Sequence, residues 1–334
     1  MRRLAACLLG LVLVAGCGGT RQVREPDVVV DGGDSTPSPD EARHEGRAGR
    51  VHIWVVTHGQ ASSTFWSIVR NGVEAASRQA DVQVTYRAPD IYSVRTMREL
   101  IEDAAAAKPD GLVVSIPTAE LADPIRRAVR AGIPVVSINS GSEIARRIGT
   151  LTHVGQPEEQ AGYLAGRRLA RAGAHTALCV NQEVGNDGLD RRCQGFARAM
   201  REAGGSSRVV AIDTKDLMGS RERLRSAASR PGVDAVLTLN NQGGELAIEV
   251  APAGATLATF DYSPKVLEAV RTGRMEFAVD QQPYLQGYLP IVFLAERARY
   301  GLFPAQGDVV PTGPSFITSA NAGQVERLSL QGIR

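Results

Sequence analysis

The sequence predicts an α/β protein with two lobes, each a doubly wound parallel sheet covered by helices. From residue 50 onward, short apolar runs that suit strands buried on both faces alternate with segments of helical periodicity. One strand–helix–strand segment also recurs along the chain with similar spacing: 29 positions separate Asp110 from Asn139, and 27 separate Asp234 from Asp261. A chain of 334 residues is long enough for two domains of ordinary size. We therefore expect two similar sheets rather than one large sheet.

The N-terminus has the features of an export signal. Arg2 and Arg3 precede an apolar run over 4–15, which is shorter than the roughly 20 residues that a transmembrane helix needs. The run leads into Val-Ala-Gly-Cys, which resembles a bacterial lipobox with its cysteine at position 17. This motif predicts a lipoprotein signal peptide over 1–16 and a diacyl lipid anchor on Cys17. An ordinary signal peptide followed by an incidental cysteine is the alternative.

The segment 17–49 predicts a flexible tether behind that cysteine. It is rich in glycine, proline and charged residues and has no aromatic side chain, so it cannot bury enough apolar surface to fold. The whole chain has a formal net charge of +2, for which Arg2 and Arg3 account. A chain cleaved before Cys17 would therefore be neutral, without the basic face expected of a nucleic-acid-binding protein.

The alternation of strands and helices begins with a strand over 51–57 and a helix over 65–80. The strand is a continuous apolar run, and Phe65, Val69 and Val73 recur on one side of the helix. Further strands are expected at 82–86, 111–115, 133–138, 175–181, 207–212, 234–238, 256–260 and 277–280. Further helices are expected at 93–107, 118–131, 157–172, 189–203, 219–229, 241–250, 263–272 and 284–299.

Two cysteines remain in the folded part of the chain, Cys179 and Cys193. Their spacing of 14 positions supplies no ligand set for a metal. In an oxidising compartment they form either a disulfide or two buried thiols. The chain also lacks a Gly-x-Gly-x-x-Gly fingerprint, a phosphate-binding loop and a Gly-x-Ser-x-Gly elbow. We therefore expect no enzyme, no cofactor and no metal.

Polar side chains follow the expected strands, where ligands bind in open parallel sheets. Amides and hydroxyls predominate there, with one carboxylate, and such groups suit a neutral polyol because they donate and accept hydrogen bonds. The alternative is that each one caps a helix or closes a turn. At the start of the first helix, Phe65 and Trp66 add flat apolar faces for a sugar ring. The strand-end pairs are Thr57-His58, Asn139-Ser140, Asn181-Gln182, Asn240-Asn241, Asp261-Tyr262 and Gln281-Gln282.

These residues carry a resemblance to a known family. The region 51–334 resembles the ribose-type periplasmic sugar-binding proteins, the extracytoplasmic receptors of ATP-driven importers. The resemblance implies two Rossmann-like lobes joined by three crossovers (the type I periplasmic binding protein fold), closing on one sugar. It places 50–152 plus 281–305 in the N-terminal lobe and 153–280 plus 306–334 in the C-terminal lobe. The matching segments are Ser63–Gly72, Pro109–Gly111, Gly132–Asn139, Arg192–Phe196, Asn240, Phe260-Asp261 and Gln281–Gly287.

The resemblance also implies which residues bind the sugar. Phe65 matches an aromatic residue that sandwiches the sugar, and Trp66 is its neighbour. The sequence departs from the family pattern at Ser63-Thr64, where the family has Asn-Pro, and at Asn139, where it has an acid, so a ribose specificity does not follow. Arg191 and Arg192 compete for the binding arginine, and the spacing to Phe196 favours Arg192. The implied ligand-binding residues are Ser63, Phe65, Trp66, Asn139, Arg192, Asn240, Asp261 and Gln281.

The sequence thus leads to an expected function outside the cytoplasm. We expect a monomeric lipoprotein, in the periplasm or anchored to the outer face of the cytoplasmic membrane, that captures a neutral monosaccharide or polyol. Its partner would be the permease of an ATP-driven importer. The alternative is a sugar-sensing receptor domain that reports to a membrane kinase. His58 either touches the ligand or has an ordinary role in a turn or the core.

Overall fold

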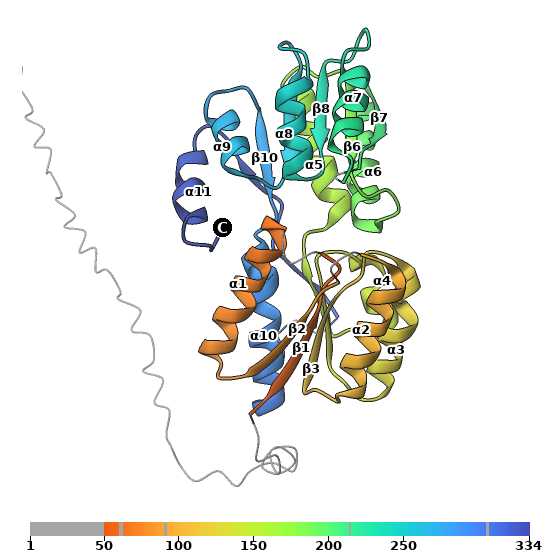
Figure 1. Cartoon of the computed structure of the whole chain (residues 1–334), viewed down its shortest axis with the longest axis vertical. Coiled ribbons are helices and arrows are strands. Elements are labelled where there is room, and N and C mark those ends of the chain that lie inside the picture. Colours follow the sequence, from red (N-terminus) through yellow and green to blue (C-terminus); the bar gives the residue numbers. More distant parts are fainter. Residues whose placement is uncertain (1–49, 60–62, 90–91, 214, 305–306) are drawn as a thin grey trace, which may run out of the picture. The chain divides into compact units, whose positions relative to one another are not determined.

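The computed structural model describes residues 50–59, 63–89, 92–213, 215–304 and 307–334, which form two six-stranded sheets (Figure 1). The strand order is β2-β1-β3-β4-β5-β11 in the first sheet and β7-β6-β8-β9-β10-β12 in the second. Both orders are those of a doubly wound α/β unit, so the predicted fold class is confirmed. The expected signal peptide, Cys17 and the tether over 17–49 lie outside the described residues.

The first sheet is parallel throughout, and helices alternate with its strands along the chain. Its strands are β1 (His52–Val56), β2 (Gln83–Arg87), β3 (Gly111–Ser115), β4 (Val135–Ile138), β5 (Thr152–Gly155) and β11 (Val309–Pro311). Its helices are α1 (Thr64–Gln79), α2 (Val94–Ala106), η2 (Ala119–Leu121), α3 (Ala122–Arg130), α4 (Ser142–Ala145), η3 (Arg146–Ile148) and α10 (Pro283–Tyr300).

The second sheet is parallel except for β12, which pairs antiparallel with β10. Its strands are β6 (Thr176–Asn181), β7 (Ser206–Ala211), β8 (Ala235–Thr238), β9 (Thr256–Phe260), β10 (Phe277–Asp280) and β12 (Ser315–Ile317). Its helices are α5 (Glu158–Arg171), α6 (Asp187–Glu202), α7 (Leu217–Ala228), α8 (Asn241–Val250), α9 (Pro264–Arg271) and α11 (Ala322–Ser329).

The central strands are apolar throughout because helices cover both of their faces. Every residue of β3 is buried, and its side chains alternate between two cores. Val113 packs in a cluster with Ile291 of α10, whereas Val114 packs in another with Ile125 of α3. In the described part of the chain, no helix has the length and apolar character needed to cross a membrane.

The division between the two sheets differs from the expected lobe boundaries by a few residues. The strand β5 belongs to the first sheet, so the first crossing follows Gly155 rather than residue 152. The strand β11 also returns to the first sheet, which moves the last crossing from 305 to the segment after Pro311. Both strands are short, and β5 carries Thr152 and His153 in place of an apolar run, so neither shows a strand pattern in the sequence.

Each sheet has one pair of helices whose backbones touch, and glycines permit the contact. A Cβ atom on Gly287 of α10 would lie 1.9 Å from the Val69 carbonyl oxygen of α1. Similarly, a Cβ atom on Gly162 of α5 would lie 1.9 Å from the Arg192 carbonyl oxygen of α6. Figure 1 shows α1 alongside α10. These contacts set the position of Trp66 in the first lobe and of Arg192 in the second.

Candidate functional site

Asn139 and Asp261 occupy matching places at the carboxyl ends of the two sheets. Asn139 directly follows β4 and Asp261 directly follows β9, the strands that close the two echoed segments. Both residues have left-handed backbone conformations, with φ of 62° and 58°. Asn and Asp tolerate this region better than other residues with a Cβ atom. The sequence echo therefore corresponds to a structural one, and each copy ends in a polar side chain.

Aromatic rings gather where β1 ends in the first lobe. The Trp66 ring is buried and meets the half-buried Phe65 ring edge to face, with 5.2 Å between centroids. His58, two residues after β1, lies 4.9 Å from the Trp66 ring and 6.0 Å from the Tyr92 ring. The half-buried Ser63 precedes α1 and makes no capping hydrogen bond with its side chain. The sequence pattern did not indicate Tyr92, which lies two residues before α2.

Asn139 takes part in a chain of polar contacts that reaches the second lobe. Its side chain is 8% exposed, and its Nδ2 donates to Oε1 of Gln286 at 3.4 Å. The Ser140 hydroxyl donates to Oδ1 of Asn139 at 3.1 Å or to Oδ1 of Asn186 at 3.3 Å. Asn186 is the N-cap residue of α6, so these contacts join the end of β4 to a helix of the other sheet.

Arg192 is the buried member of the two competing arginines. Its Nε donates to Oε2 of Glu158 at 2.5 Å, and its Nη2 donates to Oε1 of Glu158 at 2.9 Å. Arg191 instead pairs with Asp187 at 3.0 Å and is partly exposed. Burial opposes the charge on Arg192, but Glu158 outweighs it, so the arginine pKa lies above its ordinary value. No local pattern pointed to Glu158 as its partner, because the two residues lie 34 positions apart in the chain.

Asp261 connects to Arg192 through Gln281. The Gln281 Nε2 donates to Oδ1 of Asp261 at 2.6 Å, while its Oε1 accepts from Nη2 of Arg192 at 2.7 Å. Burial raises the pKa of the Asp261 carboxyl to about 7, and both Arg192 and Gln281 act in the opposite direction. The Arg192 guanidinium also lies 4.6 Å from the centroid of the Phe260 ring. Three of the expected site residues are thus brought together in one hydrogen-bonded row.

Asn240 has a structural role as well as a place at a strand end. Its Oδ1 accepts from the backbone N–H of Gly243 at 2.8 Å and caps α8. Its Nδ2 has no hydrogen-bond partner among the described residues, so one half of this amide is unused. Asn181, by contrast, is buried and uses its Nδ2 on Asp190 at 2.8 Å and its Oδ1 on the Glu183 N–H. The capping alternative therefore holds in part for Asn240.

Cys179 and Cys193 form a disulfide, with 2.02 Å between the sulfur atoms. It joins the middle of β6 to α6 at the residue next to Arg192. The choice between a disulfide and two thiols, which the sequence left open, is thereby resolved. Among the described residues, no group of histidine, cysteine and carboxylate side chains could hold a metal ion.

Three connections join the sheets, and glutamine side chains link two of them. They follow β5, β10 and β11. Gln282, with φ of 51°, uses its Nε2 to donate to the Thr312 carbonyl at 2.6 Å. Gln286 donates to the Gln281 carbonyl at 3.1 Å and to Oγ1 of Thr312 at 3.2 Å. The second and third connections are therefore joined next to Gln281 and Asn139.

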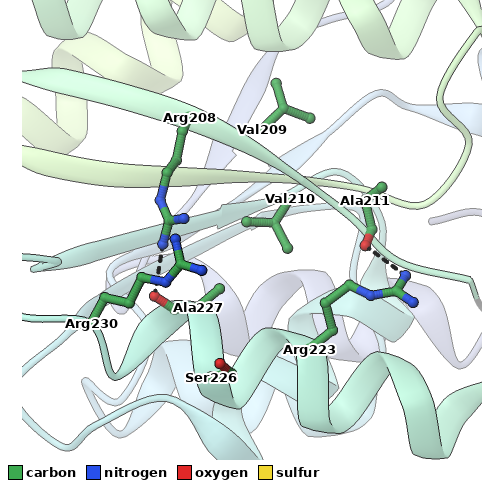
Figure 2. A pocket seen from close by; sticks show the side chains of 8 residues that line it. All are labelled: Arg208, Val209, Val210, Ala211, Arg223, Ser226, Ala227 and Arg230. Atoms are coloured by element: carbon green, nitrogen blue, oxygen red, sulfur yellow. Dashed lines mark hydrogen bonds between the residues drawn. The ribbon is translucent and has the colours of Figure 1, made fainter.

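A hollow of about 440 Å³ lies elsewhere on the second lobe, between β7 and α7 (Figure 2). Arg208 spans it to the Ala227 carbonyl at 3.0 Å, and Arg223 reaches the Ala211 carbonyl at 3.2 Å. None of the predicted ligand-binding residues lines it. The remaining lining residues are Val209, Val210, Ser226 and Arg230.

Comparison with known proteins agrees with this fold. The periplasmic binding protein domain family matches residues 53–301. The chain is 25% identical to a xylose/arabinose-binding protein of Sulfolobus acidocaldarius over 285 residues, 78% of this chain and 69% of that protein.

Solved structures are similar over most of the chain. A carbohydrate transporter from Acidothermus cellulolyticus in complex with myo-inositol is 33% identical, with a TM-score of 0.79 over 86% of this chain and 100% of the other. A glucose-galactose binding protein from Geobacillus stearothermophilus shares the fold at 24% identity, with a TM-score of 0.70 over 82% and 99% of the two chains. The chain therefore belongs to the periplasmic binding protein family.

Proposed function

We propose that this protein captures a neutral monosaccharide or polyol between its two lobes and delivers it to an ATP-driven importer. The observation that carries the proposal is the pair Asn139 and Asp261, which present polar side chains in the same left-handed conformation at the ends of both sheets. The similarity to the myo-inositol complex from Acidothermus cellulolyticus, over its full length, supports a cyclic polyol as the ligand.

The charges around these residues favour an uncharged ligand. Arg192 is engaged by Glu158 in a buried ion pair, so its charge is already balanced. Burial lowers the pKa of His58 to about 3, which keeps its ring neutral. Among the described residues of the site, a sugar phosphate or sugar acid would therefore meet no unpaired cation, and nothing would offset the cost of taking its charge out of water. Hydroxyl groups, in contrast, match the amide and carboxylate atoms of the site.

Each residue of the site has a distinct task in this proposal. Phe65 and Trp66 pack against the C–H face of the ring, where flat apolar surface matches flat apolar surface. The carboxylate of Asp261 accepts from two ligand hydroxyls, and the amides both donate and accept. Ser63 and Arg192 add a hydroxyl and a guanidinium donor at the edges. The amides in question are Asn139, Asn240 and Gln281.

Closure of the lobes would follow ligand binding. The three connections are the only covalent links that the described chain makes between its sheets, and Gln282 and Gln286 hold two of them together. A hinge of this kind lets the lobes rotate while the site residues in each remain fixed on their strands. The closed form, presenting both lobes at once, would dock on a permease. The protein then acts by binding, without catalysis, cofactor or metal.

The N-terminal segment would keep this monomeric receptor at the membrane. A lipid on Cys17 and the tether over 17–49 would hold it at the outer face of the cytoplasmic membrane or in the periplasm. The permease is then always within reach, because a tether of this length spans on the order of 30 Å.

A ligand panel tests the proposal. The chain without residues 1–16 and with Cys17→Ser is melted with myo-inositol, D-glucose, D-galactose, D-xylose and L-arabinose, and with glucose 6-phosphate and glucuronate as charged controls. We expect at least one neutral compound to raise the Tm in a concentration-dependent way, because a ligand that binds only the folded state stabilises it. A rise with the charged compounds alone would contradict the proposal.

A further inference from the structure

His58 is a buried histidine at the carboxyl end of β1 that the assignments above do not use. It is 7% exposed, and its ring meets the rings of both Trp66 and Tyr92 edge to face. It therefore lines the same corner of the first lobe as the aromatic side chains proposed to hold the sugar. The carboxyl end of β3, next to β1 in the sheet, supplies its main polar partner, Ser115.

Ser115 determines which ring nitrogen of His58 carries the hydrogen. Its Oγ accepts from the backbone N–H of His58 at 2.9 Å and lies 2.7 Å from Nδ1 of the same residue. The buried Ser115 hydroxyl has no other acceptor among the described residues, so its own hydrogen is paired only if Nδ1 accepts it. A neutral imidazole with an accepting Nδ1 carries its hydrogen on Nε2.

Burial also favours the neutral form of the ring. Burial lowers the pKa of His58 to about 3. The nearest aromatic neighbours give no counter-charge: Trp66 is uncharged, and the pKa of Tyr92 is raised to about 12 by burial and then by Glu183 and Glu120. Among the described residues, Nε2 has no hydrogen-bond partner. The Nε2–H group of His58 is thus a fixed, uncharged hydrogen-bond donor that these residues leave unused.

We propose that His58 binds the ligand through Nε2–H, donating to a hydroxyl or ring oxygen of a neutral polyol, and that Ser115 is the positioning residue for this donor. The inference rests on the proposed function. It assigns the first lobe a hydrogen-bond donor beside its aromatic side chains. A ligand ring packed against Trp66 would then also be held in one rotational orientation. A ligand without an oxygen at that position would leave Nε2–H unpaired and would bind more weakly.

Two substitutions test the two ring nitrogens of His58 separately. His58→Asn keeps an amide near Nδ1 but removes the donor at Nε2, whereas His58→Gln places an amide donor near Nε2. Titration calorimetry with myo-inositol and the four sugars of the panel should show affinity reduced about 10- to 100-fold in His58→Asn and less in His58→Gln. The control is His52→Asn, at the opposite end of β1, whose ring is also bonded to a hydroxyl, that of Thr85 at 2.9 Å. It should bind like the unsubstituted protein.

Monodeoxy analogues of the compound that binds identify the contact itself. The analogue that lacks the oxygen facing His58 should bind the unsubstituted protein and His58→Asn equally weakly, whereas a purely structural role would weaken every analogue by the same factor. Ser115→Ala should reduce affinity several-fold while leaving that analogue pattern unchanged.

Nitrogen NMR of the unliganded protein gives an independent result. The His58 ring should show the Nε2–H tautomer and remain neutral at pH 5, and Ser115→Ala should allow both tautomers. A ring with its hydrogen on Nδ1, or charged at pH 5, overturns the inference. So does unchanged affinity in His58→Asn when the unsubstituted protein binds a polyol. If the unsubstituted protein binds none of the neutral compounds, the proposed function itself fails and this inference fails with it.

Discussion

Arg192 and Glu158 form a buried ion pair across two helices of the second lobe, with Nε of Arg192 2.5 Å from Oε2 of Glu158. Neither side chain is more than 3% exposed. The pair sits where the α5 and α6 backbones touch at Gly162, so helix contact and charge pairing hold the same two residues. Arg192 therefore reaches Gln281 with its charge already balanced, which leaves it as a fixed donor.

Glu158→Gln should destabilise the fold and change the ligand preference. Removing one partner leaves the Arg192 charge buried without compensation, which costs about 3–5 kcal/mol. The uncompensated guanidinium charge should also make glucuronate bind better and neutral sugars worse. Urea unfolding and calorimetry measure the two effects. Glu159→Gln is the matched control, because the Glu159 pair with Arg198 is about 40% exposed and should contribute less than about 1 kcal/mol. Equal losses in both variants would contradict the role of the buried pair.

Asp261 should make the stability of the protein decrease between pH 4 and pH 7. Burial raises the pKa of its carboxyl to about 7 in the folded state, against about 3.9 in an unfolded chain. Between these values the folded state binds one more proton than the unfolded state, so its stability falls as the pH rises and levels off above pH 7. Asp261→Asn removes this contribution. Relative to the unsubstituted protein, it should therefore be more stable at pH 8 than at pH 5 in urea unfolding, and an identical difference at both pH values would refute the assignment.

The proposed ligand contacts predict that Asp261→Ala and Trp66→Ala each abolish measurable sugar binding. The first removes a paired acceptor, and the second removes the largest apolar face of the first-lobe site. Because Trp66 is buried, its truncation should also cost about 3–5 kcal/mol of stability. Phe65→Ala is the more selective probe: Phe65 is half-buried, so affinity should fall with a smaller loss of stability. If calorimetry shows unchanged affinity for the sugar in both Asp261→Ala and Trp66→Ala, the site assignment is wrong.

Local sequence patterns were sufficient to predict the bounds of several well-buried strands and of one helix. The strands β3, β9 and β10 and the helix α8 have the bounds that the sequence predicted, because continuous apolar runs and helical periodicity report burial directly. The place of Asn139 and Asp261 could also be predicted, since a polar residue after a buried strand must lie at the edge of the sheet. Neither inference requires knowledge of distant contacts.

The parts that were missed depend on contacts between distant residues. Glu158 meets Arg192 across 34 positions, and Ser115 meets His58 across 57. No periodicity encodes such pairs. The strands β11 and β12 have three residues each and lie at the sheet edges, where partner strands rather than local apolar runs define them. Sequence reasoning therefore identified the strand ends but not the partners that orient their side chains.

The disulfide should stabilise the fold and also hold Arg192 in place. It closes a loop of 14 positions, which corresponds to about 3 kcal/mol in the chain-entropy account. Cys193 is adjacent to Arg192, so the double variant Cys179→Ser, Cys193→Ser should lower both the Tm and the affinity for the bound polyol. A reducing agent should lower the Tm of the unsubstituted protein towards that of the double variant and leave the variant itself unchanged. If the Tm falls but calorimetry shows the same affinity, the bond stabilises the lobe without positioning Arg192.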